Sequence, residues 1–152
     1  MNEPDVVAAM RTFFSAASFP DGAQVTHLRT DAHLALIDYG GLGPYQRISI
    51  PIGRSVVHPD LVGQLSDGET LVALEAKGAG DLVKGIAQAE QYQQGVQQSF
   101  LALPSDRLND LVRETTRRKN IGLLVTNNDA APHLLRRAQV TKDRVLLIRS
   151  IL

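Results

Sequence analysis

The sequence predicts an α/β domain, in which helices cover the faces of a β-sheet. Three observations support this class: apolar residues at helical spacing open the chain, several strand-like segments follow, and the second half alternates helix with strand. Short turns between the early strands favour antiparallel hairpins, whereas the later alternation favours crossover connections. The length of 152 residues suits one domain spanning residues 1–152.

The first helix is expected to begin at Pro4 and Asp5, because proline fits the first helical position and an acid suits the positive end of the helix dipole. Apolar residues then recur at helical spacing up to about Ala17. Strand-like segments follow, with glycines and a proline turning the chain between the last two. They are Val25–Arg29, His33–Tyr39 and Tyr45–Ile52.

A tight hairpin is expected next. The segments Asp60–Leu65 and Thr70–Glu75 flank Ser66-Asp67-Gly68-Glu69, and an Asp-Gly pair between two apolar segments is a strong hairpin signal. Because the two strands run antiparallel, their outer ends meet, so Asp60 and Glu75 should be neighbours.

The second half predicts alternating helices and strands, with Leu108, Leu111 and Val112 facing inward on the second of these helices. In order, we expect a helix from Asp81 to about Gln98, a strand Ser99–Leu103, a helix from its cap at Ser105 to about Lys119, a strand Ile121–Thr126, a short helix from about Ala130 to Ala138, and a strand Arg144–Ile151.

Composition and charge exclude several classes of protein. The chain has no cysteine, which excludes disulfides and thiolate metal sites. It lacks both an apolar run long enough to cross a bilayer and a signal-peptide pattern, so we expect a cytoplasmic protein without a membrane partner. The net charge is zero, but residues 1–104 carry 6 basic and 11 acidic side chains, whereas residues 105–152 carry 10 basic and 5 acidic. This asymmetry suggests a cation for the first part and an anionic partner for the second.

One edge of the predicted sheet gathers residues that suit metal chemistry. Glu75 and Lys77 are two positions apart on a strand, so they share a face, and Asp60 lies at the same end of the hairpin. Two carboxylates form an oxygen site that suits Mg²⁺ or Mn²⁺, with the backbone carbonyl of Ala76 as a further ligand. A lysine beside them can orient an attacking water or stabilise charge on a phosphate.

This order of motifs resembles the PD-(D/E)XK nuclease superfamily, which includes many restriction endonucleases and archaeal Holliday-junction resolvases. The resemblance rests on Pro59-Asp60, fourteen intervening residues, and Glu75-Ala76-Lys77. A Gln-xxx-Tyr motif, Gln88 to Tyr92, follows on the next helix, as in many members of the superfamily.

The resemblance covers roughly residues 55–126 and implies a restriction-endonuclease-like fold. This fold has a mixed central β-sheet flanked by helices, with the acidic motif on a hairpin. The segment Val25–Ile52 is then an extra N-terminal strand insert, to which the sequence assigns no role.

The resemblance implies a metal-dependent nuclease that hydrolyses phosphodiester bonds in DNA, in repair or bacterial defence. Its catalytic residues would be Asp60, Glu75, Lys77, Gln88 and Tyr92, and its metal ligands Asp60, Glu75 and the Ala76 carbonyl. Many members also carry a glutamate within the first helix. Here the helix body has no acid, so Glu3, at the helix start, is the candidate for that role.

Further residues are candidates for contacts with nucleic acid, for which DNA is favoured over RNA. They are Lys84, His58, Arg117, Arg118 and Lys119. Each also has a structural interpretation: the lysines and arginines can simply face water, as charged residues on helices usually do, and His58 can be a structural histidine. A homodimer or larger complex stays open. The alternative function is a degenerate module of the same fold, which binds nucleic acid or a protein partner without cleavage.

Overall fold

The computed structural model of the chain describes residues 2–16, 23–32, 34, 43–127 and 130–136. Its helices and strands follow in the order α1 (Glu3–Ala16), β1 (Val25–Asp31), β2 (Tyr45–Gln46), β3 (Ile50–Ile52), β4 (Ser55–Val57), β5 (Leu61–Leu65), β6 (Leu71–Ala76), α2 (Leu82–Tyr92), β7 (Gln98–Pro104), the 3₁₀ turn η2 (Ser105–Arg107), α3 (Asp110–Arg118), β8 (Gly122–Asn127) and β9 (Ala130–Arg136). The described chain is therefore mixed α/β, as expected.

Seven of the strands form one mixed sheet in the order β2-β1-β5-β6-β7-β8-β9, and β3 pairs with β4 in a separate hairpin. β5 runs antiparallel to β1 and β6, whereas β6, β7 and β8 run parallel to one another. This confirms the predicted change from hairpin to crossover connections. β1 is not peripheral to the sheet, because it lies between β2 and β5.

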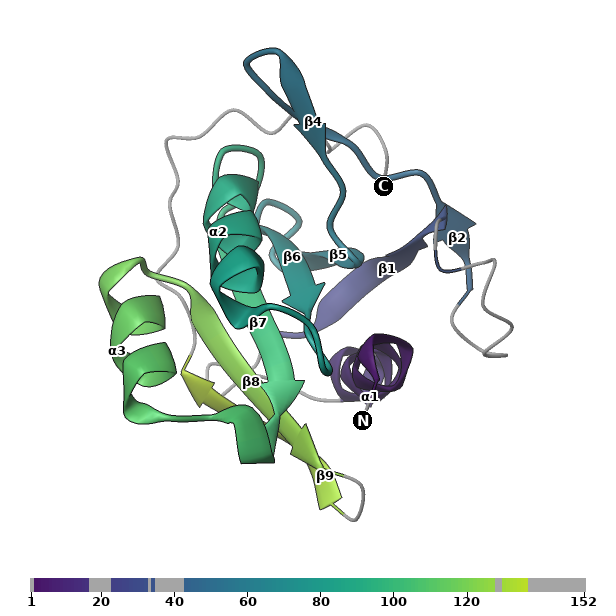
Figure 1. Cartoon of the computed structure of the whole chain (residues 1–152). Helices are drawn as coiled ribbons and strands as arrows, with labels where there is room; N and C mark the ends of the chain where they lie inside the picture. Colours follow the sequence, from purple (N-terminus) through teal and green to yellow (C-terminus); the bar gives the residue numbers. More distant parts are fainter. Residues whose placement is uncertain (1, 17–22, 33, 35–42, 128–129, 137–152) are drawn as a thin grey trace.

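Helices cover both faces of this sheet. α1 contacts β1, β6, β7 and β9, while α2 contacts β6 and β7, and α3 contacts β8 (Figure 1). Side chains alternate accordingly along β6: Leu74 packs in the cluster under α1, and Ala73 packs with Tyr92 of α2. Edge-to-face contact between Phe14 and Phe100, with ring centroids 5.8 Å apart, joins α1 to the middle of the sheet.

The predicted hairpin β5–β6 is confirmed together with its turn. Gly68 adopts a φ of +74°, which favours glycine. The Asp67 carboxylate accepts hydrogen bonds from the backbone N–H groups of Glu69 and Thr70, both at 2.8 Å. This side-chain support replaces backbone partners that the turn residues lack.

The first helix, the strand at residues 99–103 and the strand at residues 121–126 are confirmed to within a residue or two. Asp81 caps α2 by accepting from Val83 N–H at 2.9 Å, as expected for a helix starting there. The helix ends at Tyr92 and not at Gln98, because the chain turns at Gly95, where a Cβ would lie 2.8 Å from Ile50. Gln98 is already part of β7.

The expected strand Tyr45–Ile52 is wrong as a single strand. Its two ends belong to β2 and β3, and Ile48 between them donates its N–H to the side chain of Asp31 at 2.8 Å, which takes it out of any strand ladder. β3 then pairs with β4 across a turn at Gly53, whose φ is +57°. This second hairpin was not predicted.

Two helix predictions in the second half are also corrected. Ser105 opens the 3₁₀ turn η2 without capping a helix, and α3 begins later, where Asn109 accepts from Val112 N–H at 2.8 Å. The helix expected from Ala130 to Ala138 is strand β9 over its described part, because its backbone pairs antiparallel with β8. Tertiary pairing here overrides local helix propensity.

Two further strands fall largely or entirely outside the described residues: His33–Tyr39, of which only Leu34 is described, and Arg144–Ile151. Within the described residues, no helix is both long enough and apolar enough to cross a membrane.

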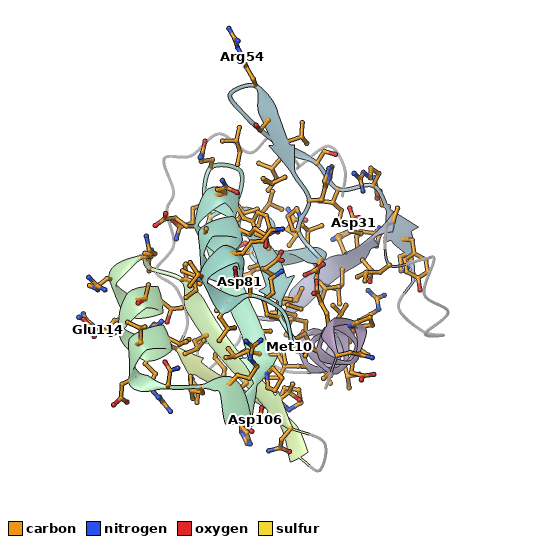
Figure 2. The ribbon with its side chains drawn as sticks, viewed as in Figure 1. Met10, Asp31, Arg54, Asp81, Asp106 and Glu114 are labelled. Carbon is orange, nitrogen blue, oxygen red and sulfur yellow. The ribbon has the colours of Figure 1, made fainter. Side chains whose placement is uncertain are left out.

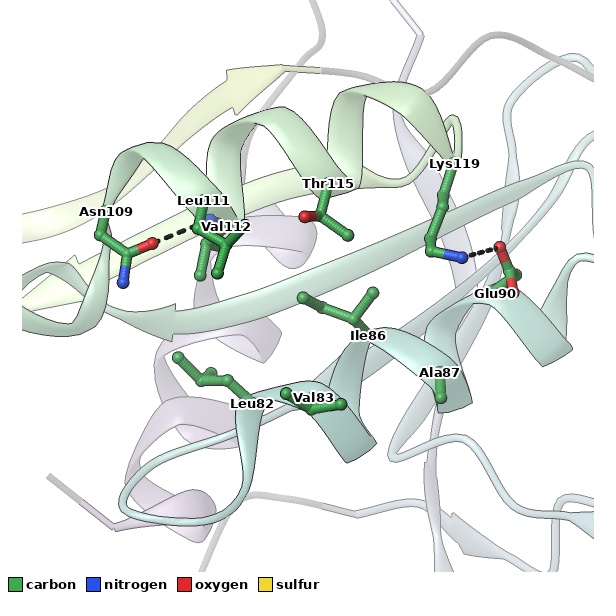
Figure 3. Close-up of a pocket in the computed structure, with 10 residues that line it drawn as sticks. All are labelled: Leu82, Val83, Ile86, Ala87, Glu90, Asn109, Leu111, Val112, Thr115 and Lys119. Carbon is green, nitrogen blue, oxygen red and sulfur yellow. Dashed lines mark hydrogen bonds and ion pairs between the residues drawn. The ribbon is translucent and has the colours of Figure 1, made fainter.

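An apolar groove of about 440 Å³ lies between α2 and α3 (Figure 3). Val83 and Leu111 line it and are largely exposed, at 77% and 71%, so the expectation that Leu111 faces inward is wrong. Val112 is buried, with 4% exposure, and Leu108 is partly buried. An ion pair between Lys119 and Glu90, 2.8 Å long, joins the two helices beside the groove.

This revised face of α3 is testable with two adjacent substitutions. We expect Val112→Ala to lower the free energy of unfolding by about 1–2 kcal/mol, since it opens a cavity under the helix. Leu111→Ala should change it by less than about 0.5 kcal/mol. Chemical denaturation measures both, and a larger loss for Leu111→Ala would contradict this orientation of the helix.

Candidate metal centre

The β5–β6 hairpin brings two carboxylates side by side at one edge of the sheet. Leu61 of β5 pairs with Leu74 of β6. Because the strands are antiparallel, the residue before Leu61 and the residue after Leu74 are the next cross-strand pair, so Asp60 lies beside Glu75 on the same face. Both side chains are almost fully buried, with 2% exposure for Asp60 and 3% for Glu75. The expected proximity of these two acids is therefore present.

A third carboxylate comes from the first turn of α1. One oxygen each from Glu3, Asp60 and Glu75 lie within 4.8 Å of one another, an arrangement that can hold a metal ion. Asn2 accepts from Asp5 N–H at 2.9 Å and so supports the start of the helix at Glu3, and the packing of α1 on β6 brings this first turn to the hairpin. The only acids near the start of this helix in the sequence are Glu3 and Asp5, and the structure brings Glu3 to the cluster.

Backbone groups hold Asp60 in place. Its Oδ2 atom accepts from the N–H of Ala76 at 2.8 Å, and its own carbonyl oxygen accepts from the N–H of Asp31 at 2.9 Å. The contact of Ala76 with this site is thus through its N–H, and a role for its carbonyl stays a prediction.

Each oxygen of the Glu75 carboxylate contacts a different side chain. Oε1 lies 3.2 Å from Nζ of Lys77, which is itself buried, and Oε2 accepts a short hydrogen bond from the Tyr92 hydroxyl. Tyr92 is the last residue of α2, and its hydroxyl reaches Glu75. The structure therefore brings Asp60, Glu75, Lys77 and Tyr92 together, as the sequence predicted.

Burial perturbs the protonation of this cluster. Burial and then the neighbouring Asp60 raise the pKa of Glu75 from 4.5 to about 8, while the contacts with Tyr92 and Lys77 oppose the rise. The pKa of Tyr92 is also raised, first by burial and then by Glu75, so its hydroxyl keeps the proton that it donates. A divalent cation among these carboxylates would oppose their mutual repulsion and favour ionised Glu75.

Gly85 gives Lys77 the room to reach Glu75, and sequence reasoning missed it. A Cβ on Gly85 would lie 2.6 Å from Cγ and 3.1 Å from Cε of Lys77, so any larger residue would displace the lysine. A glycine inside a helix costs about 1 kcal/mol relative to alanine. A glycine inside the predicted helix was therefore the available sequence signal, because such a glycine often marks a place where another part of the chain packs closely on the helix backbone.

Gln88 also lies on α2, and its side-chain oxygen is buried without a hydrogen-bond partner among the described residues. A buried acceptor of this kind normally binds a water or a ligand. Lys84, one turn before Gln88, is exposed. Among described residues, no interaction joins the side chain of either residue to the three carboxylates.

His58 does not point its ring at the acids. Its Nδ1 lies 2.7 Å from the Ile48 carbonyl oxygen, to which it donates, and its Nε2 accepts from the Arg47 guanidinium at 2.7 Å. Its backbone carbonyl accepts from the Tyr92 hydroxyl at 3.2 Å. His58 therefore supports the site through its backbone.

The predicted basic contacts at the end of α3 form ion pairs with other acids. Lys119 pairs with Glu90 of α2, 2.8 Å away, and its carbonyl accepts from the side chain of Gln93. Arg117 and Arg118 both lie within 4.0 Å of Glu114 on their own helix. Within the described part of the chain, none of these three cations forms an ion pair with Glu3, Asp60 or Glu75.

The raised pKa of Glu75 predicts a pH-dependent loss of stability. Unfolding exposes Glu75 and restores a pKa near 4.5, so ionisation between pH 4.5 and about 8 favours the unfolded chain. Relative to Glu75→Gln, the metal-free wild type should lose on the order of 1–3 kcal/mol of unfolding free energy over this range. Denaturant titrations in EDTA at several pH values measure it. A constant difference between the two proteins would contradict the assignment.

A double-mutant cycle tests the contact between Gly85 and Lys77. In the wild type, Gly85→Ala should destabilise the protein because the new methyl group clashes with the lysine. In a Lys77→Ala background the same substitution should stabilise it by about 1 kcal/mol through helix propensity. Gly80→Ala, whose Cβ would lie 3.6 Å from Lys77 Cδ, serves as the control with ordinary contact. Equal effects of Gly85→Ala in both backgrounds would exclude the coupling.

No family model matches the sequence, and no curated protein matches it either. Among solved structures, SPO1766, a protein of unknown function from Silicibacter pomeroyi, is similar with 17% sequence identity and a TM-score of 0.45. The similarity covers 68% of this chain and 64% of that one, so this chain spans less than two thirds of that protein's length. A similarity of this extent identifies neither a family nor a function.

Proposed function

We propose that this protein is a divalent-metal-dependent nuclease with a restriction-endonuclease-like fold, which hydrolyses phosphodiester bonds in DNA. The observation that supports it best is the cluster of the half-buried Glu3 with the buried Asp60 and Glu75, whose ligand atoms lie within 4.8 Å of one another, with Lys77 3.2 Å from Glu75. Asp60, Glu75 and Lys77 also belong to the pattern that resembles the PD-(D/E)XK motif, and the sheet and helices around them are compatible with that superfamily.

The residues present fit Mg²⁺ or Mn²⁺. Carboxylate oxygens are the ligands that these cations prefer, and three carboxylates grouped in a largely buried place are costly without a compensating positive charge. The unpartnered oxygen of Gln88 adds a buried acceptor on the adjacent helix. When bound, such a cation supplies Lewis-acid neutralisation of a phosphodiester and lowers the pKa of an attacking water.

The protein's own side chains have distinct tasks in this proposal. Asp60 and Glu75 hold the cation, and Glu3 adds a third carboxylate from α1. Lys77 orients the attacking water or stabilises negative charge that develops on the phosphate. Tyr92 fixes the orientation of Glu75 through its hydroxyl, so it acts as a positioning residue. Attack by water needs no covalent intermediate with the protein.

One observation favours the alternative, a module that binds nucleic acid or a protein without cleaving. Both oxygens of Glu75 already have partners, Lys77 on one and Tyr92 on the other. These contacts stabilise a buried Glu75 without a metal ion, so the carboxylate cluster can exist in a protein that does not bind metal.

Substitution of the three motif residues tests the nuclease. With Mg²⁺ or Mn²⁺, we expect wild-type protein to cleave DNA, and Asp60→Ala, Glu75→Ala and Lys77→Ala each to lower the rate at least about 100-fold. A panel of plasmid, linear duplex, single strand, branched junction and RNA reports the preferred substrate. Glu69→Ala is the matched control, since this exposed acid lies at the opposite end of the same hairpin.

Thermal denaturation with Mn²⁺ separates the two functions. If the protein is a metal-dependent nuclease, Mn²⁺ should raise the melting temperature of the wild type but not of Asp60→Ala or Glu75→Ala.

In the cleavage assay, full activity of any two of the three alanine variants would exclude the nuclease assignment. An unchanged melting temperature with Mn²⁺, combined with DNA binding and no cleavage, would support the binding module.

A further inference from the structure

We propose that the β3–β4 hairpin and the segment leading into it form a DNA-binding arm, in which Arg47 and Arg54 contact backbone phosphates beside the carboxylate cluster. The inference rests on the proposed function, because it supplies that site with a surface for its substrate. It also gives a role to part of the strand segment Val25–Ile52 and to the hairpin that continues it.

The hairpin has one face packed against the protein and one face exposed. Ile50 is buried, and Ile52 and Val57 pack with it in a cluster that includes Tyr92 at the end of α2. On the other face, the cross-strand pair Pro51 and Val56 is exposed, with 51% exposure for Val56. The arm is thus anchored on the helix that supports Glu75.

Arg54 occupies the tip of this hairpin. Figure 1 shows the hairpin extending past the helices and sheet, and Figure 2 shows Arg54 pointing outward from its end. The turn follows from Gly53, whose positive φ lets the chain reverse and places Arg54 at the outermost position. An exposed arginine there is well placed to contact an extended ligand.

The charge of this segment favours an anionic ligand. Residues 43–59 include two arginines and one histidine but no acid, although they lie within the part of the chain whose net charge is −5. The segment leads directly into Asp60. The positive charge of this segment attracts a polyanion such as DNA to the site, whereas the carboxylates alone would repel it.

Arg47 is held at the base of the arm by an ordered network. Its guanidinium donates to His58 Nε2 at 2.7 Å and lies 3.4 Å from the buried Asp31 carboxylate, yet its side chain is 56% exposed. Asp31 also donates its N–H to the carbonyl of Asp60. Arg47 is therefore fixed through one shared residue to a member of the carboxylate cluster. Part of its guanidinium remains accessible to a phosphate.

The spacing of the two arginines suits a nucleic-acid backbone. Arg54 at the tip is four positions before His58 at the base, which binds Arg47, and four positions of extended strand span about 13 Å. This is the rise of about four base pairs of duplex DNA. One duplex lying along the arm would meet both arginines while its backbone passes the cluster.

Binding without catalysis tests the arm. The probes are a fluorescent duplex DNA, its single strand and the matching RNA, each titrated with wild-type protein in EDTA at several salt concentrations. We expect Arg54→Ala to weaken duplex binding about 3- to 10-fold and to reduce the slope of log affinity against log salt by about 1. Arg54→Glu should weaken it further, with the melting temperature unchanged in both variants.

Arg113→Ala is the matched control, because Arg113 is an exposed arginine on α3. Arg47→Lys tests the base of the arm while keeping its charge, and should weaken binding less than Arg47→Ala. Equal losses for Arg54→Ala and Arg113→Ala, or an unchanged salt slope for Arg54→Ala, would overturn the arm. Weakened binding of RNA alone would overturn DNA as its ligand.

Cleavage by the same proteins keeps this proposal separate from the nuclease assignment. If wild type cleaves with Mn²⁺ and Arg54→Ala cleaves with unchanged KM, the arm fails and the nuclease stands. If the wild type never cleaves but binds duplex DNA through Arg54, the DNA-binding arm is supported and the protein is a binding module, not a nuclease. Absence of any DNA binding by the wild type would overturn both proposals.

Discussion

The burial of Asp60 beside Glu75 is the constraint around which this structure is organised. Two carboxylates in contact and almost out of water repel each other and lose hydration, which is unfavourable unless other groups compensate. The compensation comes from three directions: the N–H of Ala76, the ammonium of Lys77 and the hydroxyl of Tyr92. Ala76 ends β6, Lys77 follows it directly, and Tyr92 ends α2, so the site depends on how β6 and α2 are placed.

Both layers of helix meet at this edge of the sheet. Glu3 arrives from α1, which packs on one face of the sheet, whereas Tyr92 arrives from α2, on the other. Gly85 completes the arrangement, because a bare backbone in α2 lets Lys77 lie flat against the helix. The site therefore depends on the packing of three layers and not on the hairpin alone.

The charge asymmetry of the sequence acquires a different meaning in three dimensions. The basic residues at the end of α3 pair with Glu90 and Glu114, which are not members of the carboxylate cluster. The cations close to the cluster come instead from the acidic part of the chain: they are Lys77 and Arg47, and Arg47 is held by His58 and Asp31. Net charge over a long stretch of sequence is thus a poor guide to the local field at a site.

The sequence by itself determined the α/β class, the hairpin and the meeting of Asp60, Glu75 and Lys77, because strand alternation and an Asp-Gly turn are local rules with little freedom. Only the tertiary structure decided that residues 130–136 form a strand, since β8 offered them backbone partners. It also decided that Asp31 draws Ile48 out of a strand, that Gly85 makes room for Lys77, and that Glu3 completes the cluster. The energies of these contacts depend on how strands and helices pack against one another, which periodicity and residue propensity within one segment do not encode.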